Sequence, residues 1–98
     1  MMTMGIPMSS TVRDNPQAQR FEMDLGDGLA VANYRLTPGV VTIYHTEVPP
    51  QHEGQGIASR LVTGALEIIR ARGDKVVSRC EFLTAFLRKH AEYNDLKG

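Results

Sequence analysis

The sequence has little of what several protein classes require. It holds a single cysteine, Cys80, so no disulfide can form within the chain and a reducing compartment is expected. Its 11 basic and 11 acidic residues cancel, whereas a general nucleic-acid binder needs an excess of positive charge. No apolar run approaches the roughly 20 residues of a membrane-spanning helix. The opening residues also lack the basic and apolar regions of a signal peptide. We therefore expect a cytoplasmic protein with neither a nucleic-acid nor a membrane partner.

What is present is typical of a small globular domain. The chain has 98 residues, of which 42% are hydrophobic and 22% are charged, and this length suits one domain. Residues 1–17 are rich in Ser, Pro, Asn and Gln and show no sustained period. We expect a flexible N-terminal arm over this segment and a single domain over residues 18–98.

Three segments of the first half have the pattern of β-strands. In the first, over residues 20–25, apolar and acidic residues alternate. The second spans residues 29–36, and the third, 40–48, consists almost wholly of strand-favouring residue types. The segments 26–28 and 37–39 between them hold Gly, Asp and Pro, which favour tight turns. The sequence thus predicts an antiparallel three-stranded meander.

The second half predicts a crossover unit. Pro49-Pro50 ends the third strand, and apolar residues at three-to-four spacing predict a helix over 57–70. A short strand is expected at 75–79 and a second helix at 81–90. A right-handed β-α-β crossover would make strand 75–79 parallel to strand 40–48. The predicted fold class is therefore α+β, with a mixed sheet and few helices.

The loop between the third strand and the first helix is a candidate phosphate site. A helix N-terminus carries unpaired N–H groups and a partial positive charge, which together stabilise a phosphate. Gly54 and Gly56 lack a Cβ, so the backbone can approach phosphate oxygens closely. The expected donors are the backbone amides of Gln55, Gly56, Ile57 and Ala58. A turn that merely caps the helix is the competing interpretation.

Other ligand motifs fit the sequence poorly. The string GxxxxGK[ST] of a P-loop is absent, and Ser59 stands where a dinucleotide fingerprint needs its third glycine. His45, His52 and His90 lie in three separate predicted elements, unlike the ligands of a zinc site. We therefore expect no metal.

The loop has neighbours that together resemble a known family. Gln51-x-x-Gly54-x-Gly56, followed by Ile57-Ala58, is similar to the (Gln/Arg)-x-x-Gly-x-(Gly/Ala) signature of the GCN5-related N-acetyltransferases. The segment His45-Thr46-Glu47-Val48-Pro49 and the pattern Cys80-x-Phe82-x-x-x-Phe86-Leu87-x-x-His90-x-x-Tyr93 look like the minimal, YjdJ-like branch of that family. The resemblance covers about residues 18–96 and implies a minimal form of the family's fold.

The resemblance also implies where acetyl-CoA binds. Strands 40–48 and 75–79 would splay apart, and the pantetheine arm would pair with the free backbone near Thr46-Glu47-Val48. The pyrophosphate would rest on the loop, where the backbone of His52 and Glu53 matters more than their side chains. The implied cofactor-binding residues are Thr46, Val48, Gln51, His52, Glu53, Gly54, Gln55, Gly56, Ile57, Ala58, Ser59 and Arg60.

The candidate catalytic residues are Cys80, His45 and Glu47. Cys80 ends the last strand, just before a helix, where it could carry the acetyl group or protonate the leaving CoA thiolate; a buried structural cysteine is the alternative. His45 and Glu47 share one face of their strand and could accept the proton of the amine; a solvated surface pair is the alternative. The tyrosine that many relatives use as an acid on the last helix is missing here.

The resemblance therefore implies an acetyl-CoA-dependent N-acetyltransferase. The amine acceptor, a small molecule or a protein, stays open, because the turn at 26–28 leaves no room for the two helices that usually help to form the acceptor site. The alternative is a non-catalytic acyl-CoA-binding sensor or protein-interaction module. We expect a monomer or a weak homodimer.

Overall fold

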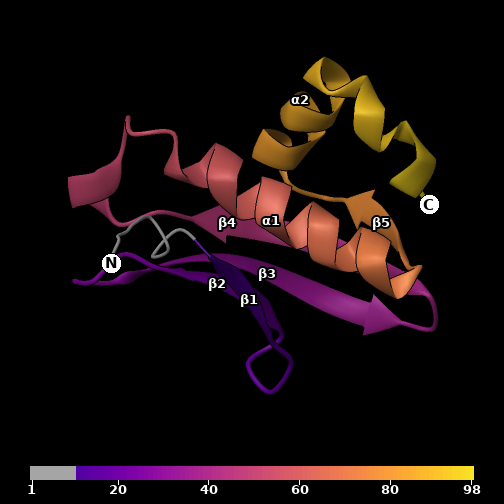
Figure 1. The fold of residues 1–98 in the computed structure, drawn as a ribbon, viewed down its shortest axis with the longest axis horizontal. Helices are drawn as coiled ribbons and strands as arrows, with labels where there is room; N and C mark the ends of the chain where they lie inside the picture. Colours follow the sequence, from indigo (N-terminus) through magenta and orange to yellow (C-terminus); the bar gives the residue numbers. More distant parts are fainter. Residues whose placement is uncertain (1–10) are drawn as a thin grey trace, which may run out of the picture.

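The computed structural model describes residues 11–98 and shows one five-stranded sheet with the helices on one side of it (Figure 1). The strands follow chain order across the sheet; the first four are antiparallel and the last is parallel to its neighbour. They are β1 (Val12–Asn15), β2 (Arg20–Asp24), β3 (Leu29–Thr37), β4 (Val40–Glu47) and β5 (Lys75–Ser78). The α-helices are α1 (Ile57–Arg72) and α2 (Glu81–Lys89), and short 3-10 helices cover Pro50–His52 and Ala91–Leu96. The predicted α+β class, meander and crossover are confirmed.

Strand β1 corrects the prediction for the N-terminal segment. The sequence predicted a flexible arm over residues 1–17, but residues 12–15 form an edge strand antiparallel to β2. The sheet therefore has five strands where four were expected. Residues 1–10, the rest of the predicted arm, lie outside the described part of the chain.

Tertiary contacts explain why so short and polar a segment forms a strand. Val12 lies against Gly64 of α1, where an added Cβ would come within 2.4 Å of the Val12 Cγ2 atom. Asp14 accepts hydrogen bonds from the Tyr34 hydroxyl and from Arg72, and each bond is 2.7 Å long. Strand β1 is thus fixed by partners far along the chain rather than by its own residue pattern.

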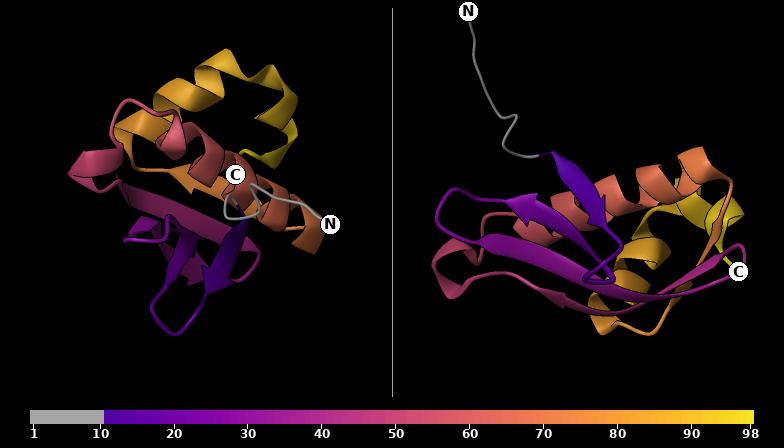
Figure 2. Two further views of the ribbon diagram at one scale, coloured as in Figure 1. Left: turned by 60° about the vertical axis from the view of Figure 1, so that its left-hand side comes forward. Right: turned by 90° about the horizontal axis from the view of Figure 1, so that it is seen from below.

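Helix α1 covers one face of the sheet and supplies much of the core. Its buried residues fall at the predicted three-to-four spacing, and each fully buried aliphatic side chain stabilises the fold by about 1.5–3 kcal/mol. The buried residues of α1 are Ile57, Leu61, Val62, Ala65, Leu66 and Ile69. Helix α2 lies on the same side of the sheet, and within residues 11–98 no helix covers the opposite face (Figure 2). No described helix is both long and apolar enough to cross a membrane.

Strands β4 and β5 part halfway along β4, as expected. Their pairing runs from Val40 opposite Lys75 to Ile43 opposite Ser78, and the Arg79 amide adds a 2.8 Å bond to the Ile43 carbonyl. Strand β4 continues to Glu47 without a β5 partner. The last part of β4 therefore has a free backbone edge where it leads into the loop before α1.

Candidate functional site

The loop after β4 delivers the N-terminus of α1 without a side-chain cap. The helix begins at Ile57, and its N-cap, Gly56, has a left-handed backbone with φ of 75°. Gly54 also has a positive φ, 81°, a region that glycine enters without steric cost. The Arg60 amide donates a 3.2 Å hydrogen bond to the Gly56 carbonyl. The amides that precede Arg60 in the first turn have no intrahelical acceptor and are free to bind an anion.

The two glycines also leave space above this turn. A Cβ added at Gly54 or at Gly56 would meet no other atom within 4 Å. Residues 53–56 are all exposed. The loop thus has the geometry of an open anion seat, and the donors and the space fit a pyrophosphate group.

His52 holds this loop to the turn between β2 and β3. Its Nε2 atom lies 2.7 Å from the Asp27 Oδ1 atom, and its Nδ1 atom lies 3.1 Å from the Gln55 Oε1 atom. The hydrogen bond to Asp27, followed by that to Gln55, raises the pKa of His52, and the same contact with His52 lowers the pKa of Asp27. The sequence interpretation gave His52 a role through its backbone and did not include Asp27, because no local pattern reports a contact across 25 residues.

Cys80 faces Thr46 across the place where β4 and β5 part. Cys80 is the N-cap residue of α2 and is 9% exposed, and its Sγ atom lies 3.6 Å from the Thr46 Oγ1 atom. The Ser78 hydroxyl donates a 3.0 Å bond to the Cys80 carbonyl and lies 2.8 Å from the Thr84 hydroxyl. The structure thus brings two predicted site residues together, and it adds Ser78 and Thr84, which sequence reasoning did not single out, as supports of the Cys80 backbone.

His45 and Glu47 form a separate pair. Their Nε2 and Oε1 atoms are 3.5 Å apart, and the side chains are 56% and 69% exposed. Successive strand residues point to opposite faces, so this pair lies on the face of β4 opposite Thr46. The predicted pairing of His45 with Glu47 is present, but it does not meet Cys80 on one face of the sheet.

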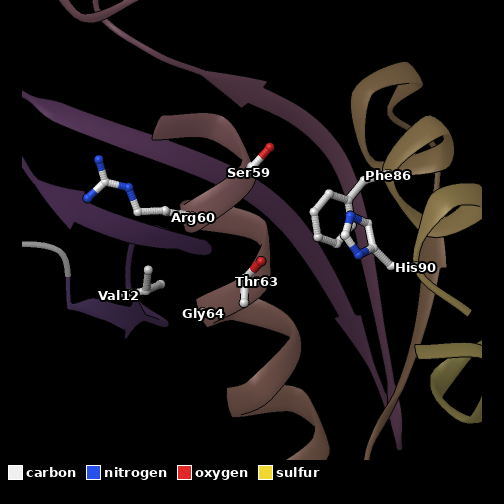
Figure 3. Close-up of a pocket in the computed structure, with 7 residues that line it drawn as sticks. All are labelled: Val12, Ser59, Arg60, Thr63, Gly64, Phe86 and His90. Atoms are coloured by element: carbon white, nitrogen blue, oxygen red, sulfur yellow. The ribbon is translucent and has the colours of Figure 1, made fainter. Parts of the chain in front are cut away.

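A groove runs over the outer side of α1 toward α2 (Figure 3). Its volume is about 550 Å³, and its lining residues are Val12, Ser59, Arg60, Thr63, Gly64, Phe86 and His90. The rings of Phe86 and His90 stack with centroids 4.1 Å apart. Phe86 is buried, whereas Phe82 is 37% exposed. His90 contributes part of the groove wall.

Comparisons with known proteins identify relatives of the sequence and of the fold. The sequence model of a family described as GCN5-related N-acetyl-transferase matches residues 20–96. A solution NMR structure of a "GCN5-like putative N-acetyltransferase" from Staphylococcus aureus resembles the fold with a TM-score of 0.69. The two chains are 24% identical, and the match covers 94% of this chain and 91% of that one. A search of curated protein sequences finds no match.

Proposed function

Because the chain belongs to the GCN5-related N-acetyltransferase family, we propose that it binds acetyl-CoA and transfers the acetyl group to an amine. One observation carries the proposal: the free edge of β4 leads directly into the uncapped N-terminus of α1. The first feature suits an extended amide-bearing chain, and the second suits a pyrophosphate. Acetyl-CoA contains both groups in this order.

The cofactor would run along this junction. Its pantetheine arm would pair with the β4 backbone from Thr46 to Val48, as an added strand pairs with a sheet edge. Its pyrophosphate would accept hydrogen bonds from the amides at the start of α1, from Gln55 to Ala58, with the Gln51–Glu53 segment leading into the seat.

The groove over α1 suits the nucleotide end of the cofactor. Ser59 and Arg60 lie on the turn of α1 that follows the anion seat, and both are exposed. The Phe86–His90 stack offers an aromatic surface on which an adenine ring can pack. Arg60 would then pair with a cofactor phosphate, since guanidinium groups bind phosphate oxygens well.

The thioester would lie in the gap between β4 and β5, accessible from both faces of the sheet. A neutral amine attacks the carbonyl carbon, a C–N bond forms, and the C–S bond breaks to release the CoA thiolate. Glu47 or His45, on the open face, would take the proton that the amine gives up. Cys80, on the helix-bearing face, would act in one of two ways. Either its thiol protonates the CoA thiolate directly, or its sulfur first attacks the CoA thioester, gives its proton to the departing CoA thiolate and then passes the acetyl group to the attacking amine as the cysteine thiolate leaves.

The sensor or interaction-module alternative keeps one observation in its favour. The turn between β2 and β3 is four residues long, from Leu25 to Gly28, and a 2.9 Å bond from the Leu25 amide to the Gly28 carbonyl closes it. Within residues 11–98, no helix covers the sheet face beside His45 and Glu47 to enclose an acceptor. A protein that only senses acyl-CoA would need the seat but no acceptor site. We place either activity in the cytoplasm, where a free thiol such as Cys80 stays reduced.

Two measurements test the proposal. Calorimetric titration should show CoA binding, and steady-state CoA release with a panel of small amines and basic peptides should exceed hydrolysis for at least one amine. Mass spectrometry after incubation with acetyl-CoA alone should decide between the two roles of Cys80, because only the covalent route leaves an acetylated cysteine. If the protein binds CoA but no amine raises CoA release above the hydrolysis rate, the result supports the sensor. If the protein does not bind CoA at millimolar concentration, both the enzyme and the sensor hypotheses are wrong.

A further inference from the structure

A side-chain contact between distant segments joins the anion loop to the turn between β2 and β3. Residues 53–56 are exposed, and the backbone bonds of this stretch are local, from the His52 and Glu53 amides to Pro49 and Pro50. The His52–Asp27 contact, by contrast, joins residues 25 positions apart. Gly28 of the same turn also lies close to Pro49, since a Cβ there would sit 3.4 Å from the Pro49 Cγ atom. The β2–β3 turn therefore contacts the loop at two points, through Asp27 and through Gly28.

The turn itself is well defined. The Gly26 amide donates a 2.8 Å bond to the Asp24 carboxylate, and the Leu25 amide donates to the Gly28 carbonyl over 2.9 Å. Asp27 is therefore presented to His52 from a fixed position. Because the Asp27 carboxylate has a fixed position, its contact with His52 restrains the glycine-containing loop.

A charged ring satisfies both contacts of His52 with Gln55 oriented as in the structure. A neutral imidazole has one N–H donor, but both ring nitrogens of His52 lie beside oxygen atoms, one on Asp27 and one on Gln55. With Gln55 in this orientation, a doubly protonated ring donates both bonds, and its charge strengthens the bond to the Asp27 carboxylate. The charged group in contact with the ring is Asp27, from the β2–β3 turn, and Gln55 is neutral; Glu53 is the next residue along the chain.

We propose that Asp27 and His52 form a proton-dependent latch that positions the phosphate-binding loop and places a positive charge beside it. This inference rests on the proposed binding of acetyl-CoA. His52 and Asp27 are positioning residues in it: Asp27 holds the imidazolium, and the imidazolium holds Gln55 and the loop. The cofactor's pyrophosphate gains both a preformed seat and a nearby cation.

The sign of the pH dependence follows from this arrangement. Hydrogen bonds to Asp27 and Gln55 raise the pKa of His52 above its ordinary value of 6.5, so the latch is fully formed below pH 6.5 and is lost as the pH rises through that raised value. CoA affinity should therefore fall across this window. The expected loss is about twofold to fivefold, the effect of one exposed charge interaction.

The test is a calorimetric titration between pH 5.5 and 8.5 with dephospho-CoA. This probe keeps the pyrophosphate but lacks the terminal phosphate monoester, which titrates near pH 6 and would obscure the effect. Asp27→Asn should weaken binding at pH 6 by about twofold to fivefold and should flatten the pH profile. Simple charge repulsion predicts the opposite sign, because the substitution removes a negative charge near the anion seat.

Asp74→Asn is the matched control. It removes the same charge, but Asp74 follows the C-terminal end of α1, where it pairs with Arg72 at 3.5 Å, so binding should keep the parent's pH profile. If Asp27→Asn binds dephospho-CoA as tightly as the parent, or more tightly, the latch is wrong.

A second readout does not depend on the cofactor. The imidazole nitrogen resonances of His52, followed by NMR in the free protein, should titrate above 6.5, and Asp27→Asn should lower that midpoint. If the midpoint shifts but the protein does not bind dephospho-CoA, the His52–Asp27 contact is supported and the proposed function is refuted. An unshifted midpoint would overturn the latch even if the protein binds CoA.

Discussion

Replacing Gly56 by alanine distinguishes an effect on anion binding from an effect on the stability of the fold. Gly56 has φ of 75°, and its added Cβ would meet no protein atom within 4 Å, so the substitution adds backbone strain but no internal clash. A left-handed backbone costs a residue with a Cβ about 1–2 kcal/mol. The lower entropy of the unfolded alanine chain offsets about 0.4–1 kcal/mol of this cost. The net loss of unfolding free energy is therefore about 1 kcal/mol, or roughly 4–8 °C in Tm for a domain of this size.

The chain contains its own control for this strain. Gly39, in the turn between β3 and β4, also has φ of 75° and also has no atom within 4 Å of an added Cβ. It lies beside Lys75, at the end of the sheet where α1 finishes, rather than at the start of α1. Gly39→Ala and Gly56→Ala should therefore lower Tm by similar amounts in thermal unfolding.

Only the Gly56 substitution should affect the cofactor. A methyl group at the seat keeps phosphate oxygens from the backbone amides, and the loss of one charged hydrogen bond costs about 1.5–3 kcal/mol, or about 10- to 150-fold in CoA affinity. Calorimetric titration of the parent and both variants measures this difference directly. If Gly56→Ala and Gly39→Ala both bind CoA like the parent, the pyrophosphate does not bind at this turn.

Three further predictions concern other parts of the molecule. Cys80→Ala should slow acetyl transfer by about 100-fold or more while CoA affinity is unchanged, since general acids and nucleophiles act on rate; equal turnover rates would return Cys80 to a packing role. Hydrogen bonds from Arg20 chiefly lower the pKa of Glu22 below 4.5, so the stabilisation that this carboxylate contributes is present above pH 4.5 and lost below it. The Tm of Glu22→Gln should accordingly approach the Tm of the parent as the pH falls below 4.5. A difference in Tm that stays constant with pH would contradict this. Gly64→Ala should destabilise the fold by about 1–3 kcal/mol through its clash with Val12, but in a Val12→Gly background the same change should become neutral or stabilising by about 1 kcal/mol through helix propensity; additive denaturation midpoints would refute the close approach.

The regular elements could be predicted from the sequence because their information is local. The three-to-four spacing of α1, the turn residues between the strands and the β-branched run of β4 each act within a few residues. The parallel direction of β5 follows from the helix that connects it to β4 as a β-α-β crossover. The sharp backbone turn before α1 could be predicted for the same reason, since Gly54 and Gly56 both adopt a positive φ.

The features that the sequence did not predict depend on contacts between distant residues. Strand β1 has one apolar residue, Val12, and its formation depends on Gly64 and on Asp14 binding Tyr34 and Arg72. No window of neighbouring residues carries that information.

Burial of Glu22 is a second feature of this kind. Alternation predicted that its side chain would face outward, yet the residue is only 3% exposed. Arg13 of β1 and Arg20 of β2 bind its carboxylate over 2.9 Å and 2.7 Å and cover it. Because β1 was not predicted, the partner that shields Glu22 was not predicted either.

The two-sided gap explains how so small a domain could divide the chemistry of acetyl transfer. Thr46 and its neighbours His45 and Glu47 alternate along one free strand edge, so one strand supplies groups to both faces of a thioester bound there. The helix-bearing face holds the Cys80 thiol at 3.6 Å from Thr46, where the leaving sulfur would need a proton. The open face holds the exposed His45–Glu47 pair, where an incoming amine would lose one. In the proposed mechanism the sheet itself would keep the proton donor and the proton acceptor apart, and no residue within α2 would be required as the acid.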